Sequence, residues 1–228
     1  MRFFTTEGPV RAEDHYCLPP LERWNLAEVL ELIEQKKYFL LHAPRQTGKT
    51  TCLLALMAYL NQHTRYRAVY ANLEGAQTAR EDVARGMRTI CGTIEAAARL
   101  YLNVDRLHDW TEIAWQARGI DGVLTGLLET WSAHTSTPLV LLLDEVDALI
   151  GDTLIALLRQ LRAGYAQRPD HFPHTVVLCG VRDLRDYRIH SSAERAIITG
   201  GSAFNIKAKS LRLGDFSQDE VETLLGEH

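Results

Sequence analysis

The residues with the strongest chemical signature form the run APRQTGKT, residues 43–50. This run fits the pattern G-x-x-x-x-G-K-[ST], with Ala43 in place of the first glycine. In such a loop, successive backbone N–H groups curl around a phosphate, and Gly48 would let the backbone approach it without a Cβ in the way. The alanine predicts a negative φ at Ala43, because a positive φ is strained for a residue with a side chain.

Two side chains of the same run have defined parts in nucleotide chemistry. Lys49 can bridge the β- and γ-phosphates, and the Thr50 hydroxyl can bind Mg²⁺. A chance fit to the pattern has a probability of about 2% over this length, and the strand before and helix after the loop lower it further. The candidate nucleotide-binding residues are Ala43, Pro44, Arg45, Gln46, Thr47, Gly48, Lys49, Thr50 and Thr51.

Two adjacent carboxylates, Asp144 and Glu145, end a second apolar run, PLVLLLDE. A buried parallel strand presents its last side chains at the edge of the sheet where α/β folds bind ligands. We expect Asp144 to hold Mg²⁺ mainly through a water ligand and Glu145 to polarise the attacking water. The alternative is a strand that merely ends in two exposed acids. The phosphate loop upstream favours the first interpretation, and the adjacent glutamate points to the branch of P-loop proteins that hydrolyses ATP.

Other residues near these motifs could contribute to the same site. Arg182, which follows the apolar run TVVLCG, could donate to phosphate oxygens, and a salt bridge with a nearby carboxylate is the alternative. Asp147 is expected to cap a helix or shape a loop, and Cys179 to lie in the core. Residues 15–20 could close over an adenine or simply pack against the sheet.

Composition restricts the class of protein. The chain has 228 residues, of which 46% are hydrophobic and 24% charged. This length suits one large domain or two small ones that need no disulfide bridge or structural metal to fold. The formal net charge of −4 does not imply wholesale binding to nucleic acid or to an anionic membrane. Four cysteines without a C-x-x-C pair indicate reduced thiols in a cytoplasmic protein. No apolar run approaches the roughly 18 residues of a membrane span.

Apolar strand-like runs alternate with amphipathic helical runs, which predicts an α/β fold with a mostly parallel sheet. The expected strands are 38–42, 68–72, 138–145, 175–180 and 210–213. The expected helices begin at 25, 49, 78, 123, 152 and 217, and those at 123 and 152 end at 133 and 162. Residues 102–119 have a weak pattern and are expected to form an insertion over the sheet edge.

Three helix starts carry the spacing of a capping box, in which a short polar residue precedes a glutamate by three positions. These pairs are Asn25 with Glu28, Thr78 with Glu81, and Ser217 with Glu220. The last helix keeps apolar side chains that need a packing partner. We therefore expect that the chain is cut at the start of a second, helical domain.

The motifs together resemble an AAA-type ATPase of the signalling, STAND-like kind found in bacteria and archaea. The resemblance covers most of the chain, through the segments YCLPPLERW, HAPRQTGKTT, LVLLLDEVDAL, VLCGVRD and SLRLGDFSQDEV. It implies a three-layer α/β/α P-loop NTPase fold with strand order 5-1-4-3-2, Mg-ATP as the ligand, and a helical lid after the fifth strand.

The resemblance also implies a role for each motif residue. By position, Lys49 and Thr50 would bind phosphate and Mg²⁺, Asp144 would bind Mg²⁺, and Glu145 would be the base. Arg182 would occupy the sensor position, where many AAA proteins have Asn, Thr or Ser. Lys49, Glu145 and Arg182 are thus the candidate catalytic residues.

We expect a leader at 1–24, an ATPase domain at 25–214 and the start of a truncated helical lid at 215–228. The leading hypothesis is a Mg²⁺-dependent ATPase domain that couples nucleotide state to a missing C-terminal lid or effector region, with a homo-oligomer as a possible assembly. One alternative is a nucleotide-gated interaction switch with negligible hydrolysis. Another is a DNA-handling ATPase subunit, which would need a basic surface that the net charge does not support.

Overall fold

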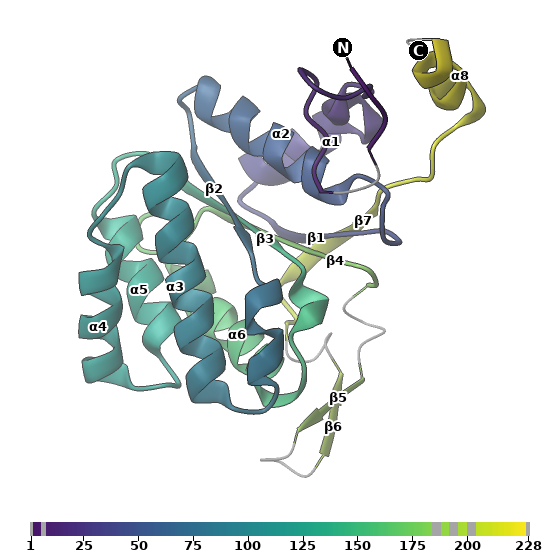
Figure 1. The fold of residues 1–228 in the computed structure, drawn as a ribbon. Helices are drawn as coiled ribbons and strands as arrows, with labels where there is room; N and C mark the ends of the chain where they lie inside the picture. The colour runs from purple at the N-terminus through teal and green to yellow at the C-terminus, as the bar shows by residue number, and fades with distance from the viewer. Residues whose placement is uncertain (1, 6–7, 184–187, 192–195, 200–203, 227–228) are drawn as a thin grey trace.

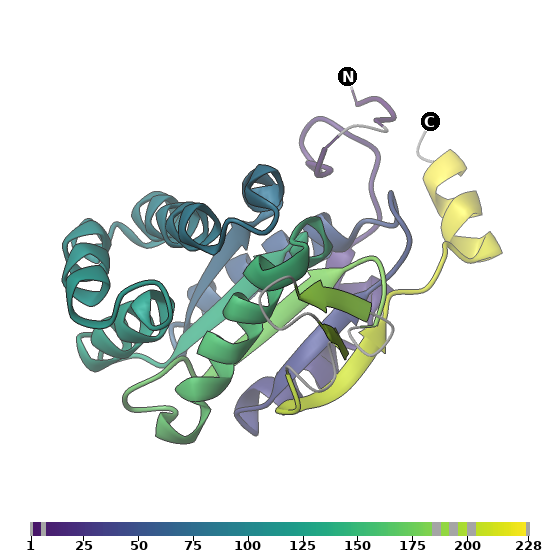
Figure 2. The ribbon, with the colours of Figure 1, turned by 90° about the horizontal axis from the view of Figure 1, so that it is seen from below.

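A parallel sheet lies at the centre of the molecule, with helices on both faces (Figures 1 and 2). The computed structural model describes residues 2–5, 8–183, 188–191, 196–199 and 204–226. The strands of this sheet are β1 (Tyr38–His42), β2 (Arg67–Asn72), β3 (Leu139–Asp144), β4 (Thr175–Gly180) and β7 (Lys207–Arg212).

The order of the strands is β2-β3-β4-β1-β7, and all neighbours are parallel. Because β7 is the fifth predicted strand, the predicted α/β class and the order 5-1-4-3-2 are confirmed. β4 lies between β1 and β3, so the carboxyl ends of these three strands share one edge of the sheet. That edge brings the loop after β1 close to the acidic pair after β3.

Side chains along each strand alternate between two separate cores, as the period of a strand requires. In β3, Leu139, Leu141 and Leu143 belong to one buried cluster, whereas Val140 and Leu142 belong to the other. All five are at most 1% exposed, so the strand is covered on both faces. This burial explains why β3 is a continuous apolar run rather than an alternating one.

One face is covered by α1 (Leu26–Glu34) and α2 (Lys49–Gln62). The backbone N–H of Glu28 donates to the Asn25 side chain at 3.2 Å, which confirms that Asn25 is the N-cap of α1. Val29 and Ile33 of α1 are fully buried against the sheet. The helix that follows the phosphate loop, α2, packs in the same cluster through Cys52, Leu53 and Leu56.

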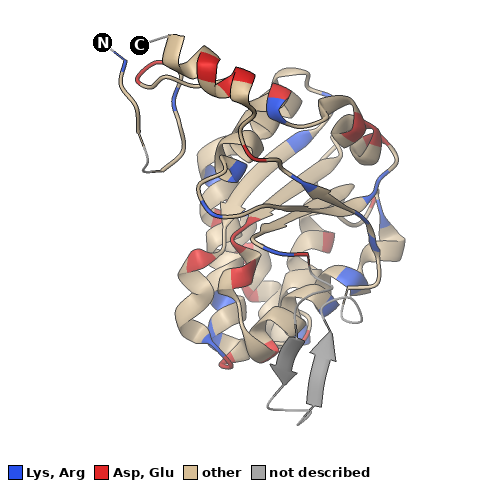
Figure 3. Cartoon of the chain, turned by 90° about the vertical axis from the view of Figure 1, so that its right-hand side faces the viewer, with Lys and Arg blue, Asp and Glu red and all other residues tan. Residues whose placement is uncertain are grey.

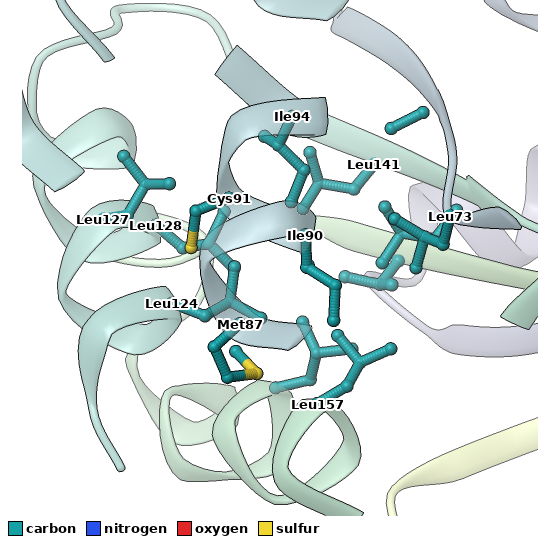
Figure 4. Close-up of a cluster of buried hydrophobic side chains, with 14 of the residues drawn as sticks. Leu73, Met87, Ile90, Cys91, Ile94, Leu124, Leu127, Leu128, Leu141 and Leu157 are labelled. Carbon is teal, nitrogen blue, oxygen red and sulfur yellow. The ribbon is translucent and has the colours of Figure 1, made fainter. Parts of the chain in front are cut away.

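The other face is covered by α3 (Val83–Leu102), α5 (Val123–Ala133) and α6 (Gly151–Ala163). Figure 4 shows part of this core, in which Met87, Ile90 and Ile94 of α3 lie among leucines of α5, α6 and β3. These three side chains follow the spacing of one helix face and are fully buried. The largest apolar cluster thus lies opposite the face that carries α2.

Residues 102–119, which were expected to form an insertion over the sheet edge, contain a regular helix, α4 (Leu107–Arg118), because Leu107, Trp110 and Ala114 form a buried stripe at helical spacing. The predicted N-cap of the helix before it was wrong. The N-cap of α3 is Asp82, whose carboxylate accepts from the Arg85 N–H at 3.0 Å. Thr78 lies instead within a 3₁₀ turn, η2 (Glu74–Ala79), that precedes the cap.

The remaining described elements are short. They are the 3₁₀ turns η1 (Pro20–Arg23), η3 (Val146–Ala148) and η4 (Tyr165–Gln167), the antiparallel pair β5 (Arg188–Ser191) and β6 (Ala196–Thr199), and α8 (Gln218–Gly226). The predicted capping box of α8 is confirmed, since Ser217 and Glu220 bond to each other's N–H groups at 3.2 and 2.7 Å. Among the described residues, no helix is both long enough and apolar enough to cross a membrane.

Candidate functional site

The loop from residue 43 to residue 48, here called the phosphate loop, joins β1 to α2. Two of its residues have a left-handed backbone, Gln46 with φ of 61° and Gly48 with φ of 86°. Ala43 is not among the positive-φ residues of the described chain, which confirms the prediction made for the alanine. The Ala43 N–H donates to the Gly180 carbonyl at 3.3 Å, so the loop begins as an extension of the sheet beside β4.

Lys49, the first residue of α2, points its ammonium group into the phosphate loop. Its Nζ donates to the Ala43 and Pro44 carbonyls at 2.9 and 2.8 Å, and the residue is only 6% exposed. The Thr47 hydroxyl also donates to the Pro44 carbonyl, at 2.9 Å. Pro44, Arg45 and Gln46 are exposed, whereas Thr47 is buried. The loop therefore encloses one positive charge at the N-terminus of a helix, an arrangement suited to an anion.

Asp144 joins the acidic strand end to α2. Its side chain is fully buried, and Oδ2 accepts from the Thr50 hydroxyl at 2.7 Å and from the Tyr70 hydroxyl at 3.0 Å. Oδ1 accepts from the Glu145 N–H at 2.9 Å. Strand alternation accounts for this placement, because Asp144 points to the same face as Leu142, the face that α2 covers. The structure thus brings together two predicted metal-binding side chains from distant parts of the sequence.

Glu145 is half-buried immediately after β3 and has a left-handed backbone, with φ of 55° and ψ of 39°. Burial raises the pKa of its carboxyl group, and the negative charges of Asp144 and Asp147 raise it further. The nearby Lys49 ammonium opposes this shift. A carboxylate whose pKa is raised holds a proton more readily, which suits a general base.

Asp147 follows β3, and Arg182 follows the neighbouring strand β4. The Asp147 carboxylate accepts from the Val181 N–H at 3.0 Å, so it shapes the loop after β4, as the sequence suggested. Arg182 follows β4 with an exposed side chain, and the adjacent Asp183 pairs with Lys207 at 2.5 Å. A sensor function for Arg182 stays a prediction. Cys179 is fully buried in the core beside Asp144, as expected.

The segment before the sheet, the start of α2 and the C-terminal segment that includes α8 line a pocket of about 140 Å³ beside the phosphate loop. Its lining residues are Phe4, Thr5, Val10, Tyr16, Cys17, Leu18, Pro20, Arg23, Gly48, Thr51, Cys52, Phe216 and Leu224. The leader therefore lies against the loop, and the Val10 N–H donates to the Thr51 hydroxyl at 3.2 Å. His15, by contrast, contacts Phe3, with the rings 4.8 Å apart, and does not line the pocket.

Two residues at this site were missed by sequence reasoning. Tyr70 lies in β2, and burial together with the Asp144 carboxylate raises the pKa of its hydroxyl, which therefore stays a donor. Arg23, at the end of η1, donates to the Thr47 carbonyl of the phosphate loop. Neither residue belongs to a motif, and only the alternation in AVYAN could have placed Tyr70 on the α2 face. No group of three or more His, Cys, Asp or Glu side chains that could hold a metal occurs among the described residues.

The chain is similar to known proteins in its family and in its fold. A family model for an AAA-like domain matches residues 21–228. No curated protein matches the sequence. The solved structure of Cdc6p from Pyrobaculum aerophilum is similar with a TM-score of 0.55 and 21% identity, covering 92% of this chain and 49% of that chain. AMPPCP-bound DnaA from Aquifex aeolicus has a TM-score of 0.49 and 15% identity, covering 94% and 53%. The chain spans about half the length of these two structures.

Proposed function

This chain belongs to the AAA-like domain family, and from that membership we propose that it binds ATP with Mg²⁺ and hydrolyses it. The observation that carries the proposal is the 2.7 Å hydrogen bond from the Thr50 hydroxyl to Asp144 Oδ2. It puts the first turn of α2 in contact with the acidic end of β3, which is the contact that a phosphate-bound metal requires.

The phosphate loop would hold the phosphates. Gly48 is the N-cap of α2 and has a left-handed backbone, and the N–H groups of the first helical turn have no helical acceptor of their own. Lys49 neutralises phosphate charge by exchanging its bonds to the Ala43 and Pro44 carbonyls for bonds to phosphate oxygens. The buried position of its ammonium strengthens this attraction, because screening by water is weaker there.

Thr50 and Asp144 would hold Mg²⁺. Asp144 is a fully buried carboxylate whose described donors, the hydroxyls of Thr50 and Tyr70 and the N–H of Glu145, are all neutral groups. A hydroxyl and a carboxylate supply the hard oxygen atoms that Mg²⁺ prefers, so the residues fit this ion. When bound, the ion would withdraw charge from the phosphate oxygens.

Glu145 would take the proton of the attacking water. Its raised pKa and its position next to the metal-binding Asp144 support this role. Arg182, exposed after β4, would reach the terminal phosphate as a cationic sensor.

The pocket beside the phosphate loop would receive the adenine. Tyr16, Leu18 and Pro20 offer apolar surface on the leader, and Thr51 of α2 also lines the pocket. Its volume of about 140 Å³ suits a single planar base rather than a whole nucleotide. Because α8 also lines this pocket through Leu224, nucleotide binding would move α8 and a partner region docked on it. Val221 and Leu225 of α8, which are 42% and 62% exposed, would contact that region.

The test of binding is calorimetric titration with Mg-ATP. Lys49→Ala is expected to weaken binding by roughly a hundredfold, because it removes a buried charge that pairs with phosphate. Lys209→Ala, a change of a half-exposed lysine on β7, is the matched control and is expected to bind as the wild type does. Equal affinities of the wild type and Lys49→Ala would refute the assignment of the site.

The test of hydrolysis is a single-turnover experiment. Glu145→Gln is expected to slow the chemical step by roughly a hundredfold or more, since it removes the base, while ATP affinity persists. A wild type that binds ATP with the same negligible turnover as Glu145→Gln would instead establish a nucleotide-gated switch.

A further inference from the structure

Arg23 contacts two segments that are far apart in the sequence, and its side chain is only 6% exposed. Its Nη1 donates to the Thr47 carbonyl in the phosphate loop, and its Nη2 donates to the Gly214 carbonyl, after β7, at 3.0 Å. The guanidinium carbon lies 3.8 Å from the centre of the Phe216 ring, just before α8. One buried cation therefore joins the phosphate loop to the segment that leads into α8.

The bond to Thr47 has a geometric consequence for the next residue. A trans peptide unit is planar, so the carbonyl of one residue and the N–H of the following residue point in opposite directions. Because Arg23 holds the Thr47 carbonyl on its own side, the Gly48 N–H must point away from the guanidinium group. A charge-assisted bond to the carbonyl also polarises the peptide unit, which makes that N–H a stronger donor.

We propose that Arg23 is a positioning residue for phosphate binding, because it fixes and polarises the Thr47–Gly48 peptide unit, and that it couples this unit to the position of α8. The inference rests on the proposed function, since it assumes that the phosphate loop binds phosphate. Arg23 itself acts through the Gly48 N–H.

The contact between Arg23 and α8 can become tighter. Arg23 Nε is buried and has no hydrogen-bond acceptor among the described residues. Glu220 Oε1 on α8, whose first turn is acidic (Figure 3), lies 3.7 Å from it, beyond hydrogen-bond distance. A buried donor without a partner is unfavourable, so an approach of α8 that gives Nε this acceptor is stabilising. The same guanidinium group thus bonds to the phosphate loop and faces a possible acceptor on α8.

The first test compares Mg-ATP with magnesium tripolyphosphate, which has no base, by calorimetry. Arg23→Gln is expected to weaken both ligands by about tenfold, the effect of one charge-assisted hydrogen bond. Arg212→Gln removes a 63% exposed arginine from β7 and is expected to leave both affinities unchanged. If Arg23 only packs against the adenine, Arg23→Gln weakens ATP and leaves tripolyphosphate unaffected, and this result would overturn the proposal.

The second test examines the coupling to α8. Phe216 is 42% exposed, so Phe216→Ala is compatible with folding. It is expected to weaken tripolyphosphate binding by about threefold in the wild type and to have no further effect in Arg23→Gln. Equal losses in both backgrounds would contradict the coupling. If Arg23→Gln does not fold, Arg23→Lys replaces it with the same expectation, because a lysine keeps the charge and loses the planar pair of donors.

Failure of this inference and failure of the proposed function give different results. A wild type that binds neither ATP nor tripolyphosphate refutes the proposed function and the inference together. A wild type that binds both, with Arg23 variants that bind tripolyphosphate equally well, refutes the inference and leaves the proposed function standing.

Discussion

At the scale of single residues, the acidic end of β3 contains two carboxylates in different environments. Asp144 is fully buried and accepts three hydrogen bonds from neutral donors. Glu145 is only half-buried, and its pKa is raised by burial and by the carboxylates around it. The different surroundings fit the two proposed roles, with Asp144 as a ligand for the cation and Glu145 as the group that takes a proton.

The raised pKa of Glu145 predicts a pH-dependent effect on stability in the nucleotide-free protein. The folded state binds the Glu145 proton more tightly than the unfolded state, whose ordinary value is 4.5. Wild-type stability therefore falls as pH rises from about 4.5 through the raised pKa, because ionisation is opposed in the folded state. Glu145→Gln lacks this loss and should be more stable at neutral pH.

Urea unfolding at several pH values measures this difference. The advantage of Glu145→Gln should be largest at neutral pH and should vanish below about pH 4.5, where both states of the wild type are protonated. An advantage that stays constant with pH would show that another effect of the substitution is responsible.

Tyr70 provides a second prediction at this scale. Its hydroxyl donates to Asp144 Oδ2 at 3.0 Å, and Tyr70→Phe leaves that buried oxygen with fewer donors. The expected cost is roughly 1.5–3 kcal/mol of unfolding free energy. The Mg²⁺ concentration needed for half-maximal ATP binding should also rise, because the carboxylate is less firmly oriented.

Tyr66→Phe is the matched control, since Tyr66 packs in the same core four residues earlier, which is about 13 Å along a strand. It should leave the Mg²⁺ dependence unchanged. Identical Mg²⁺ titrations for Tyr70→Phe and the wild type would argue against this orienting role.

At the scale of elements, the crossing of α3 and α6 depends on one glycine. A Cβ at Gly86 would collide with the side chain of Thr153, which is fully buried in α6. Gly92 lies on the same helix, and a Cβ there would meet nothing within 4 Å. Substitution of each glycine by alanine therefore separates the effect of packing, at Gly86, from the effect of helix propensity, at Gly92.

Gly86→Ala is expected to lower the free energy of unfolding by roughly 1–3 kcal/mol, because α3 and α6 must move apart. Gly92→Ala should raise it by roughly 0.5–1 kcal/mol, since alanine is the better helix former at an open position. Chemical denaturation measures both. A stabilising effect of Gly86→Ala would mean that the helices cross with more space than the structure shows.

At the scale of the whole molecule, the proposed ligand would contact the phosphate loop, α2, the leader and α8, so its binding should stabilise the fold as a unit. At a free ATP concentration about a hundred times the dissociation constant, the gain is about 2.7 kcal/mol. For a chain of this size, such a gain raises Tm by roughly 5–10 °C.

Thermal unfolding with and without Mg-ATP measures this shift. Lys49→Ala should reduce the gain to about 0.4 kcal/mol at the same ATP concentration, and Lys209→Ala should retain the full shift. A shift of the same size in Lys49→Ala would mean that ATP stabilises the protein from a different site.

The sequence by itself determined the elements and motifs whose signals are local. Strands 38–42 and 175–180 and the helix 123–133 were predicted with the boundaries that the structure has, because apolar runs and helical periodicity are properties of neighbouring residues. The phosphate loop and the acidic pair were found because their chemistry depends on fixed spacing. The cap of α3 was misplaced because two capping patterns, at Thr78 and at Asp82, lie close together and only folding selects one.

The tertiary structure alone decided which distant residues meet. Tyr70 and Asp144 are 74 residues apart, and their contact depends on β2 pairing with β3 in a register that points both side chains to the α2 face. Arg23 and Gly214 are 191 residues apart and meet because β7 pairs with β1 at the edge of the sheet. Such contacts follow from strand order and register. Because order and register depend on the packing of the whole chain, these contacts leave no pattern in any short stretch of sequence.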